Sequence, residues 1–86
     1  MDVKYPRHFQ KQYKKAPEKI RIVTKTRIKL FISNPTDQTL NNHILTGKLK
    51  GYRSINVTGD WRALYSERTD ENGAKVAYFD VLGTLY

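Results

Sequence analysis

Apolar residues recur at helical spacing in the first third of the chain. Phe9 and Tyr13 lie four residues apart within RHFQKQYKK, which predicts a short amphipathic helix. A second helix is predicted from about residue 17 to residue 33, because five apolar side chains fall within one arc at about 100° per residue. Pro17 suits its first turn, and Asn34-Pro35 ends it. The core-facing residues are Ile20, Val23, Ile28, Leu30 and Phe31.

The rest of the chain changes to the alternating pattern of β-strands. Three strands are predicted, at residues 49–57, 61–67 and 75–82. Residues 58–60 form a tight link between the first two, and Asn72-Gly73 is a good hairpin turn between the second and third. Residues 1–5 are a candidate edge strand. The predicted fold class is α+β, with two N-terminal helices packed on a twisted antiparallel sheet of three to four strands, in one domain of residues 1–86.

The middle strand carries different chemistry on its two faces. Trp61 and Ala63 share one face, so Arg62 points to the other, unless the strand begins after the tryptophan. Either face could meet the helices. His43 precedes the strands, near the apolar anchor Leu40, and is expected in ordered irregular structure or a short helical turn.

Charge is concentrated in the first part of the chain. Sixteen lysines and arginines stand against eight acidic residues, and residues 1–53 hold 13 of the basic and three of the acidic side chains. Such an excess favours a polyanionic partner, of which nucleic acid is the commonest. An acidic protein partner would explain it as well.

Composition argues against several classes of function. Cysteine is absent, and the two histidines, His8 and His43, form no spaced ligand motif, so neither a metal nor another cofactor is expected. A chain of 86 residues has little room for a deep pocket, so chemistry is expected on an exposed face or in a shallow groove. The chain has no apolar leader and no run of about 18 apolar residues. We expect a cytoplasmic protein without membrane contact.

Several short motifs, in order, resemble one family of bacterial proteins. These are NP near the end of a basic helix, the run HILTGKLKGYRSI, the strand DWRALY and the ending VLGT. Together they resemble the RelE superfamily of toxins from toxin–antitoxin pairs, first its YafQ-like branch and next its YoeB-like branch. The resemblance implies a small domain with two helices on an antiparallel sheet. It also implies an endoribonuclease that cleaves messenger RNA in the ribosomal decoding site without metal, by attack of a ribose 2′-OH on the adjacent phosphate.

The resemblance also assigns roles in this reaction. Arg62 stands where relatives keep the arginine of a strand motif ending in tyrosine, and would neutralise the pentavalent phosphorane. His43 stands where YafQ-like toxins place a histidine and YoeB-like toxins a glutamate, so it is the candidate base; a histidine that only fills a loop beside Leu40 is the alternative. Asp60 matches the YafQ-like pattern and would orient an acid or base, although aspartate after Gly59 is also ordinary turn chemistry.

Other residues of the same stretch are candidates for RNA contact. Trp61 would stack on a base, or would pack in the core as lone tryptophans more often do. Lys48, Lys50 and Arg53 would grip phosphates, with a solvated charged loop as the alternative.

The end of the sequence departs from the family pattern. Relatives commonly follow Leu-Gly-Thr or Leu-Gly-Ser with a histidine, whereas residues 83–86 read GTLY. Position 56, where a YafQ-like relative can carry another histidine, is Asn56. The general acid of the family is therefore missing from its expected place, and Tyr86 is an uncertain substitute because a phenol holds its proton tightly near neutral pH. We expect activity weaker than that of a full-length relative, or none.

The implied partners are a cognate antitoxin, the ribosome and mRNA, with DNA reached only indirectly through the antitoxin. One alternative is a catalytically inactive RelE-like module that still binds antitoxin or RNA. A generic basic RNA-binding domain would leave the spacing of the motifs unexplained. A gyrase-poisoning relative with the same fold would generally lack this set of residues, and fold alone would not separate these functions.

Overall fold

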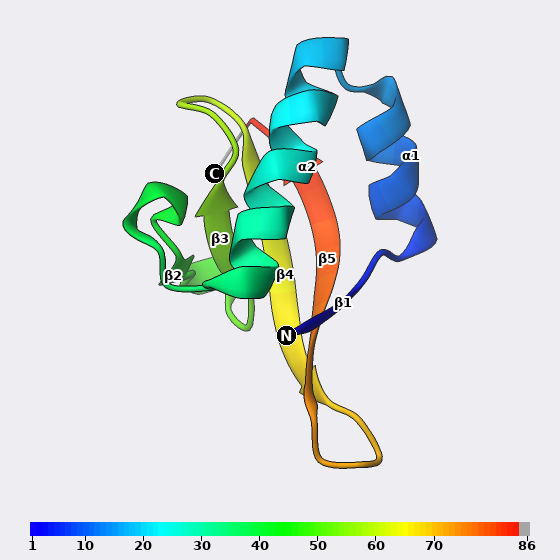
Figure 1. The fold of residues 1–86 in the computed structure, drawn as a ribbon, viewed down its shortest axis with the longest axis vertical. Helices are drawn as coiled ribbons and strands as arrows, with labels where there is room; N and C mark the ends of the chain where they lie inside the picture. Colours follow the sequence, from blue (N-terminus) through cyan, green and yellow to red (C-terminus); the bar gives the residue numbers. More distant parts are fainter. Residues whose placement is uncertain (85–86) are drawn as a thin grey trace.

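Two helices and five strands make up residues 1–84, the part of the chain described by a computed structural model. In chain order they are β1 (Asp2–Lys4), α1 (Arg7–Lys15), α2 (Glu18–Ser33), β2 (His43–Ile44), β3 (Arg53–Asn56), β4 (Arg62–Thr69) and β5 (Lys75–Gly83). Two short 3₁₀ helices, η1 (Gln38–Leu40) and η2 (Gly47–Leu49), lie on either side of β2. Both helices cover the same face of the sheet, which confirms the predicted α+β class (Figure 1).

The two helices lie where the sequence predicts them. α1 covers the predicted residues 7–15, and α2 begins immediately after Pro17. A residue before proline avoids the helical region, so Ala16 is extended (φ −68°, ψ 151°) and separates the two helices. α2 ends before Asn34-Pro35 for the same reason. Within residues 1–84, neither helix has the length and apolar character that crossing a bilayer requires.

The predicted apolar arc of α2 meets the core. Ile20, Ile28 and Phe31 are buried, and Val23 and Leu30 pack against the core with partial exposure. Thr24 is tolerated in the same arc because its Oγ1 donates a hydrogen bond to the Ile20 carbonyl oxygen at 2.7 Å. Arg27 is half-buried, and its Nε donates to the Val57 carbonyl oxygen at 3.3 Å.

The sheet has the strand order β1-β5-β4-β3-β2. β1 runs parallel to β5, and the other neighbouring pairs are antiparallel. β3 is shorter than the predicted residues 49–57, because η2 and Gly51, whose φ is +99°, precede it. The sheet has five strands rather than three to four. One of the added strands is β2, where irregular structure is predicted; two residues are too few to show alternation, and only pairing with β3 makes them a strand.

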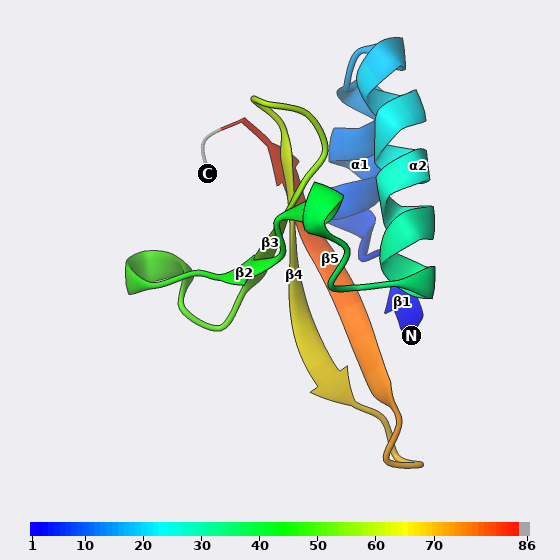
Figure 2. The same ribbon diagram turned by 60° about the vertical axis from the view of Figure 1, so that its left-hand side comes forward.

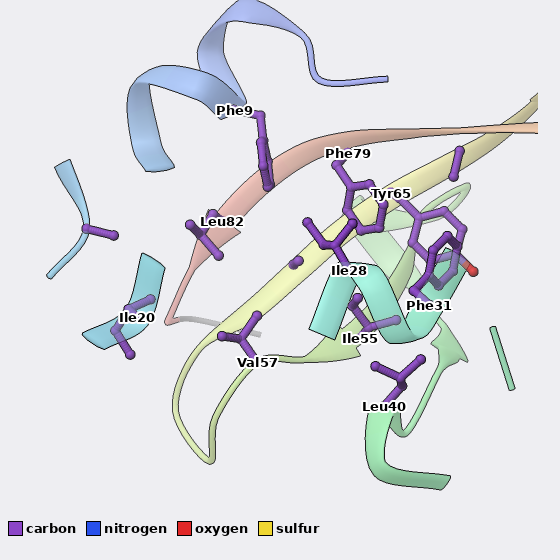
Figure 3. Packing of buried hydrophobic residues seen from close by; sticks show 13 residues of the cluster. Phe9, Ile20, Ile28, Phe31, Leu40, Ile55, Val57, Tyr65, Phe79 and Leu82 are labelled. Carbon is purple, nitrogen blue, oxygen red and sulfur yellow. The ribbon is translucent and has the colours of Figure 1, made fainter. Parts of the chain in front are cut away.

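Aromatic rings from four elements form the centre of the core (Figure 3). Phe31 of α2 contacts Tyr65 of β4 and Phe79 of β5 edge-on, with ring centroids 4.7 Å and 5.3 Å apart. Phe9 of α1 adds a tilted contact with Phe79 at 5.9 Å. Each such pair adds about 1 kcal/mol beyond the area it buries. These rings fix both helices on the sheet.

The opposite face of the sheet, called the helix-free face below, carries no helix longer than a short turn within residues 1–84. Figure 2 shows the sheet nearly edge-on, with α1 and α2 on one side and the segment around η2 projecting on the other. Ala63 and Tyr65 belong to the core, so alternation along β4 places Arg62 and Leu64 on the helix-free face. This settles which face of the middle strand meets the helices.

Candidate active site

Arg62 is held at one end of the helix-free face by the turn that precedes it. It is the first residue of β4 and pairs with Asn56 of β3 and Gly83 of β5. Its Nη1 donates to three carbonyl oxygens of that turn, those of Thr58 at 2.7 Å, Gly59 at 2.9 Å and Trp61 at 3.2 Å. Within the described residues these are the hydrogen bonds of the guanidinium, so Nε and Nη2 remain for an anion.

His43 lies on the same face, two strands away. It is exposed in β2 and pairs with Ser54 of β3, which in turn pairs with Leu64 of β4. Its Nδ1 lies 2.8 Å from the carbonyl oxygen of Asn41. Because a carbonyl can only accept a hydrogen bond, Nδ1 carries a proton in this contact. In the neutral ring, Nε2 is then the nitrogen that can accept a proton.

The distance between these two side chains follows from the register of the sheet. Two strand spacings and a shift of two residues separate their Cα atoms by about 12 Å. Both side chains point to the same face, His43 from the edge strand β2 and Arg62 from the first residue of the middle strand β4. This separation is too long for a direct hydrogen bond between them, and Ser54 and Leu64, which lie between them on this face, are buried.

The turn before β4 places Asp60 and Trp61 in different surroundings. Thr58 Oγ1 accepts hydrogen bonds from the backbone N–H groups of Asp60, at 3.3 Å, and of Trp61, at 3.1 Å. Asp60 is exposed and lies at the same end of the sheet as Arg62. Trp61 instead packs against the core, on the side of the helices. Of the two roles considered for Trp61, base stacking and core packing, this placement fits core packing.

The three basic residues predicted to grip phosphate do not lie together. Lys48 and Lys50 are exposed in and next to η2, on the segment that projects on the helix-free side (Figure 2). Arg53 pairs with Tyr65 and shares its face, the face of the helices. Its Nε donates to Asn42 Oδ1 at 2.9 Å, and Asn42 Nδ2 donates to Tyr65 Oη at 2.8 Å. Arg53 therefore anchors the chain before β2 to the core.

The helix-free face has a polar lining beside these residues. Ser54 Oγ, Asn56 Oδ1 and Ser66 Oγ are buried there without a hydrogen-bond partner among the described residues. Within residues 1–84, no three His, Cys, Asp or Glu side chains gather closely enough to hold a metal ion. Tyr86, the predicted substitute for the acid, lies outside the described residues.

One polar pair that the sequence did not reveal consists of Tyr52, which follows η2, and Asp80 of β5. Leu64 pairs with Val81 and Tyr65 with Phe79, so Asp80 is the extra residue of a bulge in β5. The Asp80 carboxylate raises the pKa of the Tyr52 phenol, first by its charge and also by a hydrogen bond, and burial adds to the effect. The signal that could have found this pair is a carboxylate inside the apolar run VAYFDVL.

We expect Asp80→Asn to move the pKa of Tyr52 down toward its ordinary value of 10.0. A raised pKa favours the neutral phenol in the folded state, so this stabilising contribution is complete below pH 10 and is lost as pH rises through the raised pKa. NMR titration of tyrosine labelled with ¹³C at Cζ measures the shift directly. Tyr78, which lies under Arg68 at 4.2 Å, is an internal reference in the same spectra. An unchanged Tyr52 titration in Asp80→Asn would show that the carboxylate is not the cause.

Comparison with known proteins finds similar chains among solved structures. Neither family models nor curated protein sequences match the chain. Among solved structures, YafQ from Escherichia coli BL21(DE3) shares 30% sequence identity, covers 96% of this chain and 91% of its own, and has a TM-score of 0.75. YafQ in its toxin–antitoxin complex with DinJ from E. coli shares 29% identity over 96% of this chain and 90% of YafQ, with a TM-score of 0.71. The YoeB/ParE toxin from Agrobacterium tumefaciens, 15% identical, covers 100% of both chains with a TM-score of 0.77 and supports the fold alone.

The fold, the sheet and this likeness over nearly the whole chain define the class of protein. The chain belongs to the RelE/ParE superfamily of toxins. Within the superfamily it is a YafQ-like toxin of a toxin–antitoxin pair.

Proposed function

We propose that this toxin is an endoribonuclease that cleaves mRNA on the ribosome without a metal ion. The observation that carries the proposal is the position of His43 and Arg62 on one face of the sheet. An exposed residue such as His43 also suits a substrate that the ribosome presents from outside the toxin.

The proposed reaction uses the ribose next to the scissile phosphate. His43 Nε2 takes the proton of the 2′-OH, and the 2′-oxygen attacks phosphorus. The new P–O2′ bond forms as the P–O5′ bond breaks, which leaves a 2′,3′-cyclic phosphate and a 5′-OH. Nε and Nη2 of Arg62 would donate to the phosphorane oxygens, where charge accumulates. Asp60, at the Arg62 end, would orient the group that protonates the departing 5′-oxygen.

The charged residues outside this pair support the choice of partners. Lys48 and Lys50 project on the helix-free side and would contact RNA phosphates of the message or the ribosome. YafQ relatives are known in complexes with DinJ, and a YoeB toxin from Staphylococcus aureus in a complex with YefM. We propose that this chain likewise binds a cognate antitoxin, and reaches DNA only through it.

We expect His43→Ala to lower ribosome-dependent mRNA cleavage by about 10²-fold, because the 2′-OH loses its positioned base. The assay maps the 5′ ends of a defined message incubated with ribosomes and each variant. His8→Ala is the matched control, since His8 is also exposed but lies on α1 and contacts Asp80 at 3.7 Å. Equal rates of cleavage by His43→Ala and by the unchanged chain would contradict the proposal. So would a rate for the unchanged chain that is the same with and without ribosomes.

A catalytically inactive module that binds antitoxin or RNA is the second candidate. Two sequence observations favour it: Asn56 stands where a YafQ-like relative can carry a histidine, and residues 54–86 contain none. Inducing the chain in bacteria without antitoxin distinguishes the two functions. An inactive module leaves both the message and bacterial growth intact.

A further inference from the structure

A small hollow lies at the edge of the sheet beside β2, and we call it the edge hollow. It is lined by Ile44 of β2, Gly51, Arg53 of β3 and Glu67 of β4, and its volume is about 230 Å³. The hollow opens on the face of the sheet that carries the helices, because Arg53 pairs with the core residue Tyr65 and shares its face. On this side β4 continues past the end of α2, so α2 leaves the hollow open to solvent (Figure 1).

Two side chains of opposite charge line the edge hollow without forming an ion pair with each other. Within residues 1–84, Glu67 pairs instead with Lys75, at 3.7 Å between Oε2 and Nζ. Glu67 lies two residues beyond Tyr65 on β4, so it is a diagonal neighbour of Arg53, at a backbone spacing of about 7–8 Å. Both charges act on the pKa of the Tyr65 phenol: burial raises this pKa most, the charge of Arg53 opposes the rise, and the charge of Glu67 adds to it. A cation and an anion therefore bound the same small space.

The guanidinium of Arg53 is held in place by one of its nitrogens. Nε donates to Asn42 Oδ1 at 2.9 Å, and Asn42 Nδ2 donates to Tyr65 Oη at 2.8 Å. This contact uses Nε and leaves the terminal Nη1 and Nη2 groups as donors toward a ligand. Gly51 leaves room beside them, since a Cβ at this position would meet no residue other than its chain neighbours within 4 Å. Ile44, 62% exposed, adds an apolar side chain.

A ligand that satisfies both charges has hydrogen-bond acceptors on one edge and donors on another. Among the nucleobases, guanine has them in pairs: O6 and N7 accept from an arginine, and the N1 and N2 nitrogens donate to a carboxylate. Each of the other bases offers a carboxylate a single donating nitrogen. The hollow is smaller than the roughly 300–1,000 Å³ of a site for a whole drug-sized ligand, so its size suits one flat ring system. The excess of positive charge on the chain favours a ligand that carries phosphate.

We propose that the edge hollow binds a guanine base, carried by single-stranded RNA or by a free nucleotide. Arg53 donates to O6 and N7, Glu67 accepts from N1 and N2, and Ile44 packs against the ring. Ile44 follows His43 in β2 and points to the opposite face, so an RNA strand that crosses this edge can reach both the hollow and His43. The RNA source rests on the proposed endoribonuclease function, whereas the free-nucleotide source does not.

Binding of mononucleotides to the 86-residue chain tests the base preference without ribosomes or cleavage. NMR titration of backbone amides measures the affinities for GMP, AMP, CMP and UMP, which carry the same phosphate. We expect GMP to bind at least about tenfold more tightly than the other three, with the largest shifts around Ile44, Arg53 and Glu67.

Two analogues of GMP test the two contacts separately. IMP lacks the N2 amino group that meets Glu67, and 7-deaza-GMP lacks the N7 acceptor that meets Arg53. Each analogue should bind at least about threefold more weakly than GMP, because it leaves one hydrogen-bonding group of the hollow without a partner.

Replacing Glu67 with glutamine keeps the shape of the side chain and removes its charge. Glu67→Gln should lower the affinity for GMP about tenfold and bring the affinities for GMP and IMP close to each other. Glu71→Gln is the matched control, because it makes the same change of charge in the exposed turn of the β4–β5 hairpin, outside the hollow. Arg53→Lys should bring the affinities for GMP and 7-deaza-GMP close to each other. Thermal unfolding of this variant is measured alongside, because Arg53 also binds Asn42.

Short single-stranded RNAs distinguish the two sources of the base. The pair consists of adenine oligomers of about five nucleotides, with and without one central guanine. Tighter binding of the guanine oligomer, lost in Glu67→Gln, assigns the site to RNA, whereas a preference confined to GMP assigns it to a free nucleotide. Equal binding across the mononucleotides and across the oligomers, or equal losses in Glu67→Gln and Glu71→Gln, would overturn the proposal. Absence of mRNA cleavage by the unchanged chain would defeat the proposed enzyme and leave a measured base preference standing.

Discussion

Replacing Arg62 with alanine is expected to lower ribosome-dependent mRNA cleavage by about 10²- to 10³-fold. The guanidinium is oriented by three carbonyl oxygens of the preceding turn, and its remaining N–H groups can meet a phosphate without reorganisation. Arg62→Lys should recover little of the rate. A lysine ammonium lacks the planar set of N–H groups with which the guanidinium binds the turn and the phosphorane at the same time. Single-turnover cleavage of a ribosome-bound message measures both variants.

Arg68→Ala is the matched control for this experiment. Arg68 lies near the far end of the same strand, on the same face, and stacks over Tyr78 at 4.2 Å. The Arg68→Ala substitution removes one positive charge without altering the Arg62 end of the sheet, so cleavage should change by less than about threefold. Because Arg62 also stabilises a turn, thermal unfolding of each variant must accompany the rates. Equal losses in Arg62→Ala and Arg68→Ala would show that only overall charge matters.

Phe31→Ala is expected to reduce the free energy of unfolding by about 3–5 kcal/mol. The Phe31 side chain is fully buried and contacts Tyr65 and Phe79 edge-on, so its removal leaves a cavity where α2 meets the sheet. Domains of this kind are stable by only about 5–15 kcal/mol, so the loss is a large share of the total. Urea unfolding monitored by Trp61 fluorescence and circular dichroism measures it.

Ile32→Ala, the next residue along α2, is the control. Ile32 is 41% exposed on α2, so the cost should be about 0.5 kcal/mol, the size of an ordinary surface substitution. If both variants unfold at the same urea concentration, the aromatic centre is not the principal stabilising contact between α2 and the sheet.

The sequence predicts only part of the arrangement of the candidate site. The alternation of DWRALY predicts Trp61 and Arg62 on opposite faces if the strand includes the tryptophan. The strand β4 begins only at Arg62, and Trp61 nevertheless packs against the core. Grouping Arg53 with Lys48 and Lys50 came from their closeness along the chain. The structure separates them, because the register of β3 aligns Arg53 with Tyr65 on the face of the helices.

Local sequence patterns specify the two helices, the three central strands and the order of the motifs that resemble RelE toxins. Those features depend on local periodicity and on breakers such as Pro17 and Asn34-Pro35, which act on the residues beside them. Three other features come from the tertiary structure: the face that the helices cover, the joining of His43 to the sheet as part of β2, and an apolar groove between α1 and α2. Each of these depends on contacts between segments far apart in the chain, whose geometry has no periodic trace in the sequence.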